Sequence, residues 1–538
     1  MMEYPLLLSH LFNRGRKLFA KKQIANRTLE GVFRYTYTDF AERVLRLMGA
    51  LKGMGVKEGD VVGTFAWNDF RHLEIYFAVP MLGAILHTIN LRLFPDQLAY
   101  IINHAEDKVI FVGDDILPLL KPFIDKLPNV ERFVVLADKE KAVPEDLEGA
   151  LNYETLLETA GPIEPRQDLS EWTPCGLCYT TATSGNPKGV IYTHRGLFLH
   201  SMATGMVDSA GLSESDVVMP VVPMFHVNGW GIPFAAVGIG AKIVLPGPRP
   251  TPKDLVELIE AERVTTVAGL PTVWVGMADA LLNERHDVSS LRVIVNGGAA
   301  IPKALIETFE KKIGVPIMQG YGMTETSPIV TVGWIKSGLR ELPYDELLSI
   351  KAKQGLPLFG VDFRVVGPDG KEIAWNGKEI GELQFRGPWI AKEYFKDPEM
   401  TKASFTADGW FRTQDIVTVD EEGYILIVDR ERDLIKSGGE WVSSLDLENT
   451  LMAHPKVAEA CVIGVPDEKW GECPVAYIVV REGFQGSLTK EELASFLKER
   501  VASFWIPGAF YFVSEIPKTS VGKFSKRILR DRYLSRTV

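Results

Sequence analysis

Short apolar runs alternate with amphipathic segments along most of this chain. The runs that predict buried strands are 61–66, 108–112, 242–245, 264–267 and 293–295. Between them, residues 97–104 and 252–262 carry apolar side chains at helical spacing. Alternation of strands and helices predicts parallel sheets covered by helices, so the expected fold class is α/β.

The pattern changes after about residue 355, where shorter strands with turn signals appear at 365–370 and 381–385. These predict a β-rich subdomain that closes a large N-terminal domain. The charged stretch 429–433 is interpreted as a linker to a small C-terminal α/β module. In that module, Thr489 to Glu492 predicts a capping box at the start of a helix. The expected domains are residues 1–431 and 432–538.

Composition narrows the function classes. The chain has 538 residues, too many for one small core, and a net charge of -11, which argues against non-specific nucleic-acid binding. Cys175 and Cys178 form a C-x-x-C without a second pair, so a buried strand is favoured over a metal or redox site. The longest apolar run, 75–86, is too short to span a bilayer. A cytoplasmic protein is expected, and loose association with a membrane surface stays open.

The strongest local signal is the segment 179–190, Tyr-Thr-Thr-Ala-Thr-Ser-Gly-Asn-Pro-Lys-Gly-Val. It follows a predicted strand and is dense in hydroxyl groups and small residues, which a phosphate-binding loop requires. It lacks the order of a Walker A motif. Taken alone, the segment is also compatible with an ordinary Ser/Thr-rich turn.

A second motif, Gln-Gly-Tyr-Gly-Met-Thr-Glu-Thr, occupies residues 319–326. Its glycines allow the backbone to approach a ligand. Tyr321 offers a flat face, Thr324 a hydroxyl and Glu325 a carboxylate suited to Mg²⁺. Further motifs follow at 413–415, 429–430 and 518–523.

The order of these motifs resembles the adenylate-forming superfamily of acyl-CoA synthetases, adenylation domains and insect luciferases. The resemblance runs from about Tyr35 to Tyr533, and is closest to bacterial and archaeal fatty-acyl-CoA synthetases through the segments 223–230 and 436–441. It implies a large N-terminal domain and a small mobile C-terminal one. It also implies an ATP-dependent ligase that forms an acyl-adenylate and pyrophosphate, then acyl-CoA and AMP.

The resemblance assigns roles to individual residues. The residues expected to grip the ATP phosphates are Thr180, Thr181, Thr183, Ser184, Gly185 and Lys188. The residues expected around the rest of the nucleotide are Gly298, Ala299 and Tyr321 at adenine, Thr324 at the α-phosphate, and Asp415 and Arg430 at the ribose. Ser184 and Glu325 are expected to hold Mg²⁺, and Lys523 to reach the α-phosphate and the carboxylate during adenylation.

The C-terminal module is expected to admit coenzyme A. Gly438 and Gly439 offer a narrow backbone passage, and Lys436 and Trp441 are counted with the cofactor-binding residues. Arg432 occupies the expected hinge. The chemistry needs positioning and cationic stabilisation rather than a covalent nucleophile. Two departures from the family pattern, Ala182 and Gln414, each replace a usual glycine.

The resemblance implies that the segment 219–240 is the helix that lines the acyl pocket and faces the carboxylate. His226 is its only ionisable residue and is placed near the carboxylate. The expected pocket residues are Val227, Gly229, Trp230, Gly231 and Phe234. An apolar pocket without an acidic residue suits medium- to long-chain fatty acids.

Other readings stay open. Aryl acids and short functionalised acids such as thioether acids fit the pocket almost as well. A ligase that loads a carrier protein and a nucleotide-binding protein without turnover are further alternatives. The predicted partners are the acid, ATP and coenzyme A, and a homodimer is a family-level expectation.

Overall fold

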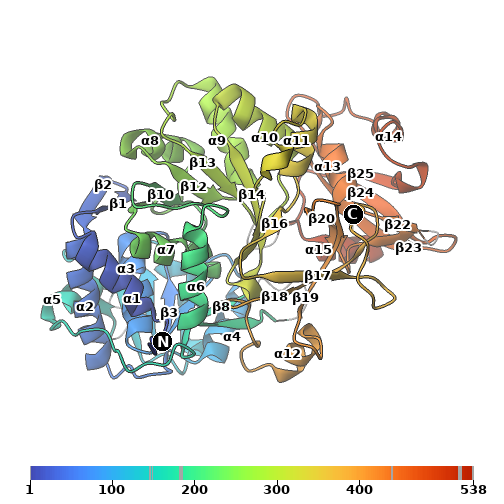
Figure 1. Ribbon diagram of the computed structural model, residues 1–538. Coiled ribbons are helices and arrows are strands. Elements are labelled where there is room, and N and C mark those ends of the chain that lie inside the picture. The colour runs from blue at the N-terminus through green and yellow to red at the C-terminus, as the bar shows by residue number, and fades with distance from the viewer. Residues whose placement is uncertain are drawn as a thin grey trace. The chain divides into compact units, whose positions relative to one another are not determined.

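The computed structural model describes residues 2–144, 147, 149–180, 186–437, 440–518 and 524–535, with the side chain of Glu440 excepted. Contacts divide these residues into two compact units. The first unit holds 2–180, 186–362 and 386–405, and the second holds 363–385 and 406–535. Strands and helices alternate through most of the first unit, and the second unit begins with a run of strands and then mixes strands with helices, so the predicted α/β class is confirmed (Figure 1).

One sheet of the first unit is parallel through its centre and antiparallel at its edges. In spatial order its strands are β16 (Leu356–Pro357), β15 (Ile329–Val332), β14 (Ile317–Gly322), β13 (Val293–Asn296), β12 (Thr266–Gly269), β10 (Val217–Pro220), β11 (Lys242–Leu245), β1 (Gln23–Thr28) and β2 (Gly31–Thr36).

A second sheet of this unit is parallel except where β8 pairs with β9. Its order is β7 (Leu151–Asn152), β6 (Arg132–Leu136), β5 (Asp107–Gly113), β3 (Val61–Phe65), β4 (Ile85–Thr88), β8 (Pro174–Tyr179) and β9 (Gly189–Thr193). Every residue of β3 and β4 is buried, as expected for central strands covered on both faces.

Helices of the first unit cover these sheets. They are α1 (Leu8–Leu18), α2 (Tyr37–Gly53), α3 (Phe70–Met81), α4 (Pro95–Ala105), α5 (Tyr153–Thr159), α6 (His194–Gly205), α7 (Ile232–Ile239), α8 (Pro252–Glu262), α9 (Pro271–Asn283), α10 (Lys303–Glu307), α11 (Tyr344–Lys351) and α12 (Pro398–Ser404). Helix α8 begins at a capping box between Thr251 and Asp254 and buries Leu255 and Ile259 in one core with strands β12 and β13.

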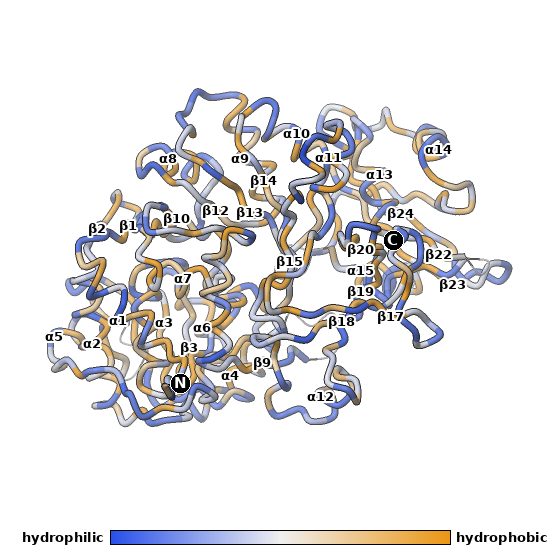
Figure 2. Tube along the Cα trace, viewed as in Figure 1, coloured by the Kyte–Doolittle hydropathy of each residue, from blue (hydrophilic) through white to orange (hydrophobic). Residues whose placement is uncertain are grey.

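The apolar stretches lie inside the layers. Figure 2 shows hydrophobic colouring along the central strands and along α3 and α7, and hydrophilic colouring along α2 and α8 between their apolar positions. All of α3 is buried, which explains why its sequence shows no polar face. Within the part of the chain that the structure describes, no helix has the length and apolar character needed to cross a membrane.

The second unit contains two further sheets. The first, antiparallel, has the order β17 (Asp362–Val366), β18 (Gly381–Arg386), β19 (Phe411–Val419) and β20 (Ile425–Arg430). The second has the order β22 (Glu440–Val442), β21 (Ile435–Ser437), β24 (Gly471–Val480) and β23 (Val457–Asp467), and β25 (Ala509–Phe512) pairs with β24. The helices are α13 (Ser444–Met452), α14 (Lys490–Lys498) and α15 (Lys526–Leu534).

Most elements expected from the pattern are confirmed. The helix expected at 252–262 has these bounds in the structure, and the C-x-x-C segment is the buried strand β8, with both thiols free. The strand expected at 264–267 begins at Thr266 instead. At α14, Thr489 accepts from the Glu492 amide, but the Glu492 carboxylate pairs with Lys456, so only half of the predicted capping box is present.

The predicted linker at 429–433 is wrong in its first two residues. Asp429 and Arg430 end strand β20, and Asp429 is buried, where its carboxylate accepts from the Ser444 amide at 2.8 Å. A buried, hydrogen-bonded carboxylate belongs to the packed unit rather than to a solvated linker. The division of the chain by contacts also differs from the predicted boundary at 431/432, which stays a prediction.

Candidate nucleotide and acyl site

The predicted phosphate loop leaves the sheet between two antiparallel strands. Tyr179 at the end of β8 pairs with Gly189 at the start of β9. Just beyond them, the Thr180 amide donates to the Lys188 carbonyl at 2.9 Å, and the Lys188 amide donates to Thr180 Oγ1 at 3.2 Å. Thr180 and Lys188, here called the neck of the loop, are therefore joined by two hydrogen bonds. The predicted residues between, Thr181, Thr183, Ser184 and Gly185, lie outside the described residues, as does Ala182.

Lys188 and Glu325 share one neighbour, Tyr394. The Lys188 ammonium lies 5.5 Å from the centre of the Tyr394 ring and 3.1 Å from Met400 Sδ. The Tyr394 hydroxyl donates to Glu325 Oε1 at 2.6 Å. Two motifs that are far apart in the sequence therefore meet around one aromatic side chain.

The turn that carries Thr324 and Glu325 is buried and held by its carbonyl groups. The Tyr192 hydroxyl donates to the Thr324 carbonyl at 2.8 Å, and the Ala391 amide donates to the Glu325 carbonyl at 2.8 Å. Only 6% of Thr324 and 8% of Glu325 is exposed. The backbone of this turn is therefore fixed, and the positions of both side chains follow from it.

The residues expected at adenine lie on neighbouring strands. Tyr321 is half-buried on β14 opposite Thr331 of β15. After β13, the Ala299 carbonyl accepts from the side-chain amides of Asn296 at 3.2 Å and Gln319 at 3.3 Å. Because Gln319 is on β14 too, the Gly298–Ala299 turn is tied to the strand that leads to Tyr321.

The expected acyl segment is not one helix. Strand β10 ends at Pro220, and α7 begins at Ile232. Between them, residues 227–231 all have positive φ: Val227 47°, Asn228 49°, Gly229 56°, Trp230 58° and Gly231 69°. In this region a non-glycine residue costs about 1–2 kcal/mol, and such strain concentrates at functional sites.

Long-range contacts hold this left-handed turn. Asn228 is buried, and its Oδ1 accepts from Cys178 Sγ at 3.3 Å and Thr88 Oγ1 at 3.4 Å. The Trp230 indole packs on the turn after β13, where a Cβ placed on Gly297 would lie 2.7 Å from it. The predicted acyl wall and the predicted adenine turn are thus direct neighbours.

The other predicted pocket residues have different environments. Phe234 is buried in the core against Tyr76 and Phe77, with ring centres 5.3 and 5.4 Å apart, respectively. Gly229 and Gly231 satisfy the positive φ of the turn, so its conformation already accounts for them. His226 is half-buried directly before the turn, and its amide donates to the Pro223 carbonyl at 3.1 Å.

The turn yields a stability prediction. Gly231→Ala should lower the free energy of unfolding by about 1–3 kcal/mol, because alanine must adopt the positive φ of this position. It would also lie 2.8 Å from His200 Nδ1. Urea unfolding measures the change. The control is Gly53→Ala, because a Cβ on Gly53 meets nothing within 4 Å. An equal effect of both substitutions would contradict the prediction that positive φ and the close contact with His200 cause the loss at Gly231.

In the second unit, Asp415 and Arg430 form the expected pair. They are direct partners on β19 and β20, and Arg430 Nε lies 3.2 Å from Asp415 Oδ1. Asp415 is 2% exposed. Its amide donates to Thr413 Oγ1 at 3.0 Å, which orients the middle of β19, where the carboxylate is attached.

Gln414, which stands where the family pattern has glycine, does adopt a left-handed backbone, with φ 60°. Its side chain is exposed. We expect Gln414→Gly to raise the free energy of unfolding by up to about 1 kcal/mol, since glycine removes the steric cost of this conformation. Gln414→Asn should fall between the two, because asparagine tolerates positive φ. Denaturant unfolding of the three proteins tests this order, and a less stable glycine variant would refute it.

The remaining predicted residues of the second unit lie around β21 and β22. Lys436 pairs with Trp441 across these strands, and its ammonium lies 5.3 Å from the indole. The Arg432 carbonyl accepts from Arg530 at 3.3 Å. Gly438, Gly439 and Lys523 lie outside the described residues. Lys518 and Phe524 form an isolated antiparallel bridge.

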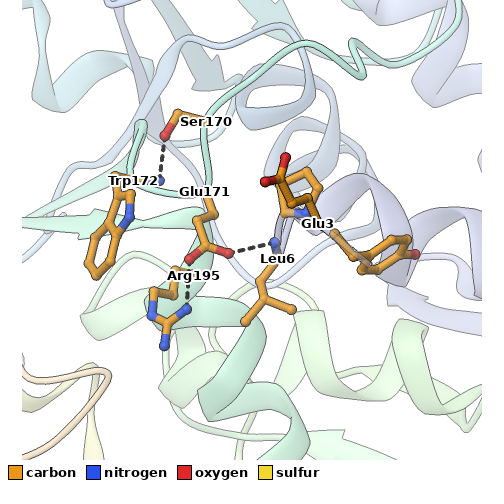
Figure 3. A pocket seen from close by; sticks show the side chains of 8 residues that line it. Glu3, Leu6, Ser170, Glu171, Trp172 and Arg195 are labelled. Atoms are coloured by element: carbon orange, nitrogen blue, oxygen red, sulfur yellow. Dashed lines mark hydrogen bonds and ion pairs between the residues drawn. The ribbon is translucent and has the colours of Figure 1, made fainter. Parts of the chain in front are cut away.

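A surface hollow of about 630 Å³ lies elsewhere in the first unit. Figure 3 shows Glu171 between Arg195 and the backbone of Leu6; the distances are 2.6 Å to Arg195 Nη1 and 3.0 Å to the Leu6 amide. Its lining residues are Glu3, Tyr4, Pro5, Leu6, Ser170, Glu171, Trp172 and Arg195, and no predicted site residue is among them. The hollow is therefore not the candidate site.

Sequence reasoning missed three buried side chains of the site: Tyr192, His200 and Tyr394. None belongs to a glycine-rich or hydroxyl-rich segment. Each acts through a contact that is distant in sequence; for example, His200 Nε2 accepts from the Ile329 amide at 3.3 Å. Burial keeps His200 neutral by lowering its pKa to about 4. No local pattern could have identified them.

Comparison with known proteins agrees with this geometry. Residues 18–395 match the AMP-binding enzyme family, and residues 446–523 match the AMP-binding enzyme C-terminal domain. A long-chain-fatty-acid–CoA ligase of Thermus thermophilus is 49% identical over 99% of this chain and 96% of its own length. A 3-methylmercaptopropionyl-CoA ligase of Ruegeria lacuscaerulensis is 41% identical over 99% of this chain and 98% of its own.

A solved structure also resembles the whole chain. A crystal structure of an anthranilate CoA ligase in complex with anthranoyl-AMP superposes with a TM-score of 0.88 at 28% identity, and covers 100% of this chain and 99% of that one. The resemblance inferred from the motifs is thereby confirmed. This chain belongs to the AMP-binding enzyme family of adenylate-forming enzymes.

Proposed function

We propose that this enzyme joins medium- to long-chain fatty acids to coenzyme A at the expense of ATP. In the first half-reaction a carboxylate oxygen attacks the α-phosphorus of ATP, and the bond to the β-phosphate breaks, which releases pyrophosphate. In the second, the sulfur of coenzyme A attacks the acyl carbonyl carbon, AMP leaves, and the thiol proton is lost.

One observation carries the proposal: the 49% identity to a long-chain-fatty-acid–CoA ligase over nearly the full length of both chains. Because the identity extends over the whole chain, it covers the residues expected to serve both half-reactions and not only those expected to bind the nucleotide. It therefore argues against the alternative of a nucleotide-binding protein without turnover.

The first unit would bind ATP at the loop that follows β8. Residues of that loop would contact the β- and γ-phosphates, with Lys188 at its closed neck. Tyr321 and the Gly298–Ala299 turn would receive adenine, and Thr324 the α-phosphate. Because Trp230 packs on the same turn as the adenine site, an acid bound along Trp230 would place its carboxylate near the nucleotide.

Glu325 fits the donor set of a magnesium ion. Its buried carboxylate is the kind of hard oxygen ligand that Mg²⁺ uses beside substrate phosphates. Because Mg²⁺ is usually bound by one or two carboxylates together with substrate phosphates, the phosphates would supply much of the coordination. Glu325, with Ser184, would hold the ion, which would supply charge stabilisation at the phosphates.

The second unit would bind the ribose through Asp415, with Arg430 as its partner. Lys436, Gly438, Gly439 and Trp441 would border the passage for coenzyme A. Residues 1–431 and 432–538 would act as an adenylation domain and a mobile C-terminal domain, with Arg432 at the hinge. Lys523 would serve the adenylation step.

A second candidate substrate class is a short functionalised acid. The 41% identity to a 3-methylmercaptopropionyl-CoA ligase supports it, and the resemblance to an anthranilate CoA ligase supports an aryl acid. His226 would lie near the carboxylate of either class.

An acid panel separates these candidates. AMP formation with ATP and coenzyme A is measured for octanoate, palmitate, 3-methylmercaptopropionate and benzoate, and compared as kcat/KM. A fatty acid should give the highest value. Preference for the thioether or aryl acid would transfer the assignment to that class, and pyrophosphate release without added acid would count against a ligase. Absence of AMP formation with coenzyme A would favour a carrier protein as acceptor.

We propose in addition that the enzyme is a homodimer and associates at most loosely with membrane surfaces. Light scattering of the purified protein measures the first property. Sedimentation with lipid vesicles measures the second.

A further inference from the structure

We propose that Tyr394 is a positioning residue of the nucleotide site, which orients the Glu325 carboxylate toward Mg²⁺-bound ATP and holds Lys188 at the neck of the phosphate loop. This inference rests on the proposed function of the same site. It assigns a role to a side chain outside every motif that the sequence singled out.

The segment around Tyr394 is hydrogen-bonded to the turn of Glu325 at two described points and to Ile329, the first residue of β15, at a third. Trp389 Nε1 donates to the Ile329 carbonyl at 3.1 Å, and the Ala391 amide donates to the Glu325 carbonyl at 2.8 Å. The Tyr394 hydroxyl donates to Glu325 Oε1 at 2.6 Å. The first two bonds fix the backbone, and the third fixes the side chain.

The same segment is also attached to the strand that leaves the phosphate loop. The Phe395 amide donates to the Gly189 carbonyl at 2.8 Å, and Tyr394 forms an antiparallel bridge with Val190. The backbone of Tyr394 is therefore tied to β9 and its hydroxyl to Glu325. A shift of β9 at the end of the phosphate loop would therefore also move the Tyr394 hydroxyl, which donates to the Glu325 carboxylate.

The hydroxyl is suited to this task because a tyrosine phenol carries an O–H donor, and in the structure it lies 2.6 Å from Glu325 Oε1. A phenol that donates to a carboxylate forms a short, charge-assisted hydrogen bond. With Oε1 held, the plane of the carboxylate and hence the direction of Oε2 are set before a ligand binds, which is the purpose of preorganisation.

The ring of Tyr394 also interacts with the Lys188 ammonium. Only 7% of Tyr394 is exposed, and the Lys188 ammonium lies 5.5 Å from its ring centre. An ammonium at this distance from an aromatic face is attracted by the ring quadrupole. The cation expected at the phosphates and the carboxylate expected at the metal thus keep a defined separation, with the ring between them.

Tyr394→Phe tests the hydroxyl alone, because phenylalanine keeps the ring. We expect the equilibrium affinity for ATP in the presence of Mg²⁺, measured by calorimetry, to fall about tenfold, while the affinity in EDTA stays unchanged. The free Mg²⁺ needed for half-maximal adenylation should rise by a similar factor, with little change in KM for the acid.

The matched control is Tyr153→Phe. Tyr153 is fully buried, and its hydroxyl also donates to a carboxylate at 2.6 Å, that of Glu74, which has no proposed role at the site. We expect this variant to lose thermal stability without a change in the Mg²⁺ requirement. Equal shifts in both variants, or none in Tyr394→Phe, would overturn the inference.

A double-mutant cycle separates this inference from the proposed function. If Tyr394 acts through Glu325, adding Tyr394→Phe to Glu325→Gln should cause no further loss of Mg²⁺-dependent affinity. Additive losses would place Tyr394 in an independent role and reject the inference. An unchanged Mg²⁺ requirement in Glu325→Gln alone would instead reject the metal role of Glu325.

Discussion

Glu325→Gln should slow acyl-adenylate formation by about a hundredfold and weaken its dependence on Mg²⁺. Glutamine keeps the shape of the side chain but removes the negative charge. Loss of one preorganised stabiliser of a charged transition state typically has an effect of this size. Pyrophosphate release, followed over a range of free Mg²⁺ concentrations, measures both changes.

The structure offers a matched control for this substitution. Glu74 is also a buried carboxylate, and it also accepts from a tyrosine hydroxyl at 2.6 Å, that of Tyr153. Its second partner is Arg43 at 2.7 Å, so its charge is compensated within the fold. Glu74→Gln should destabilise the protein and leave the Mg²⁺ dependence of the folded enzyme unchanged. Near-normal adenylation by Glu325→Gln at ordinary Mg²⁺ would remove Glu325 from the metal site.

Elements whose stability is encoded locally could be predicted from the sequence. Helix α8 combines a Thr251–Asp254 capping box, Pro252 in its first turn and an apolar stripe, and its predicted bounds are those of the structure. Buried parallel strands such as β3 and β5 are nearly continuous apolar runs, so they too are visible in the sequence.

The left-handed turn at 227–231 could not be predicted in the same way. Valine and tryptophan both disfavour positive φ, so the local sequence argues against the conformation that Val227 and Trp230 adopt. What offsets the strain is distant in sequence: Cys178 and Thr88 bond Asn228, and Gly297 makes room for the indole. The prediction of a helix over 219–240 failed because tertiary contacts override local preference here.

The same distinction separates the candidate site into two parts. Residues such as Tyr321, Thr324 and Asp415 are predicted from motifs, because their neighbours in the sequence are glycines and hydroxyls in a family order. Tyr394 was missed because its segment resembles an ordinary core segment, and only its hydrogen bond to Glu325 indicates a role at the candidate site. Gln414 illustrates the converse, since the family pattern usually has glycine there, and the structure has a positive φ at this position.

Lys523→Ala should nearly abolish acyl-adenylate formation and leave the second half-reaction close to the wild-type rate. Adenylation brings the carboxylate and the α-phosphate, two anions, into contact. An ammonium beside them lowers that barrier. Lys523 belongs to the proposed mobile C-terminal domain and would leave the α-phosphate before the thiol of coenzyme A attacks, so its removal should not slow the step in which AMP leaves.

The two half-reactions can be measured separately. Pyrophosphate release from ATP and acid without coenzyme A reports the first, and acyl-CoA formation from synthetic acyl-adenylate and coenzyme A reports the second. The matched control is Lys518→Ala, since Lys518 lies at the base of the same segment and pairs with Glu459 on β23. It should keep both rates near wild type, which would show that charge removal from this segment is not harmful in itself.

The ratio of the two rates decides the role of Lys523. A loss confined to adenylation, on the order of a hundredfold or more, matches removal of a transition-state stabiliser. Comparable losses in both half-reactions would mean that the substitution disturbs the C-terminal unit as a whole. A circular dichroism melt of each variant separates these cases, because the chemical role predicts an unchanged melting temperature, and a structural role predicts that the melting temperature falls together with both rates.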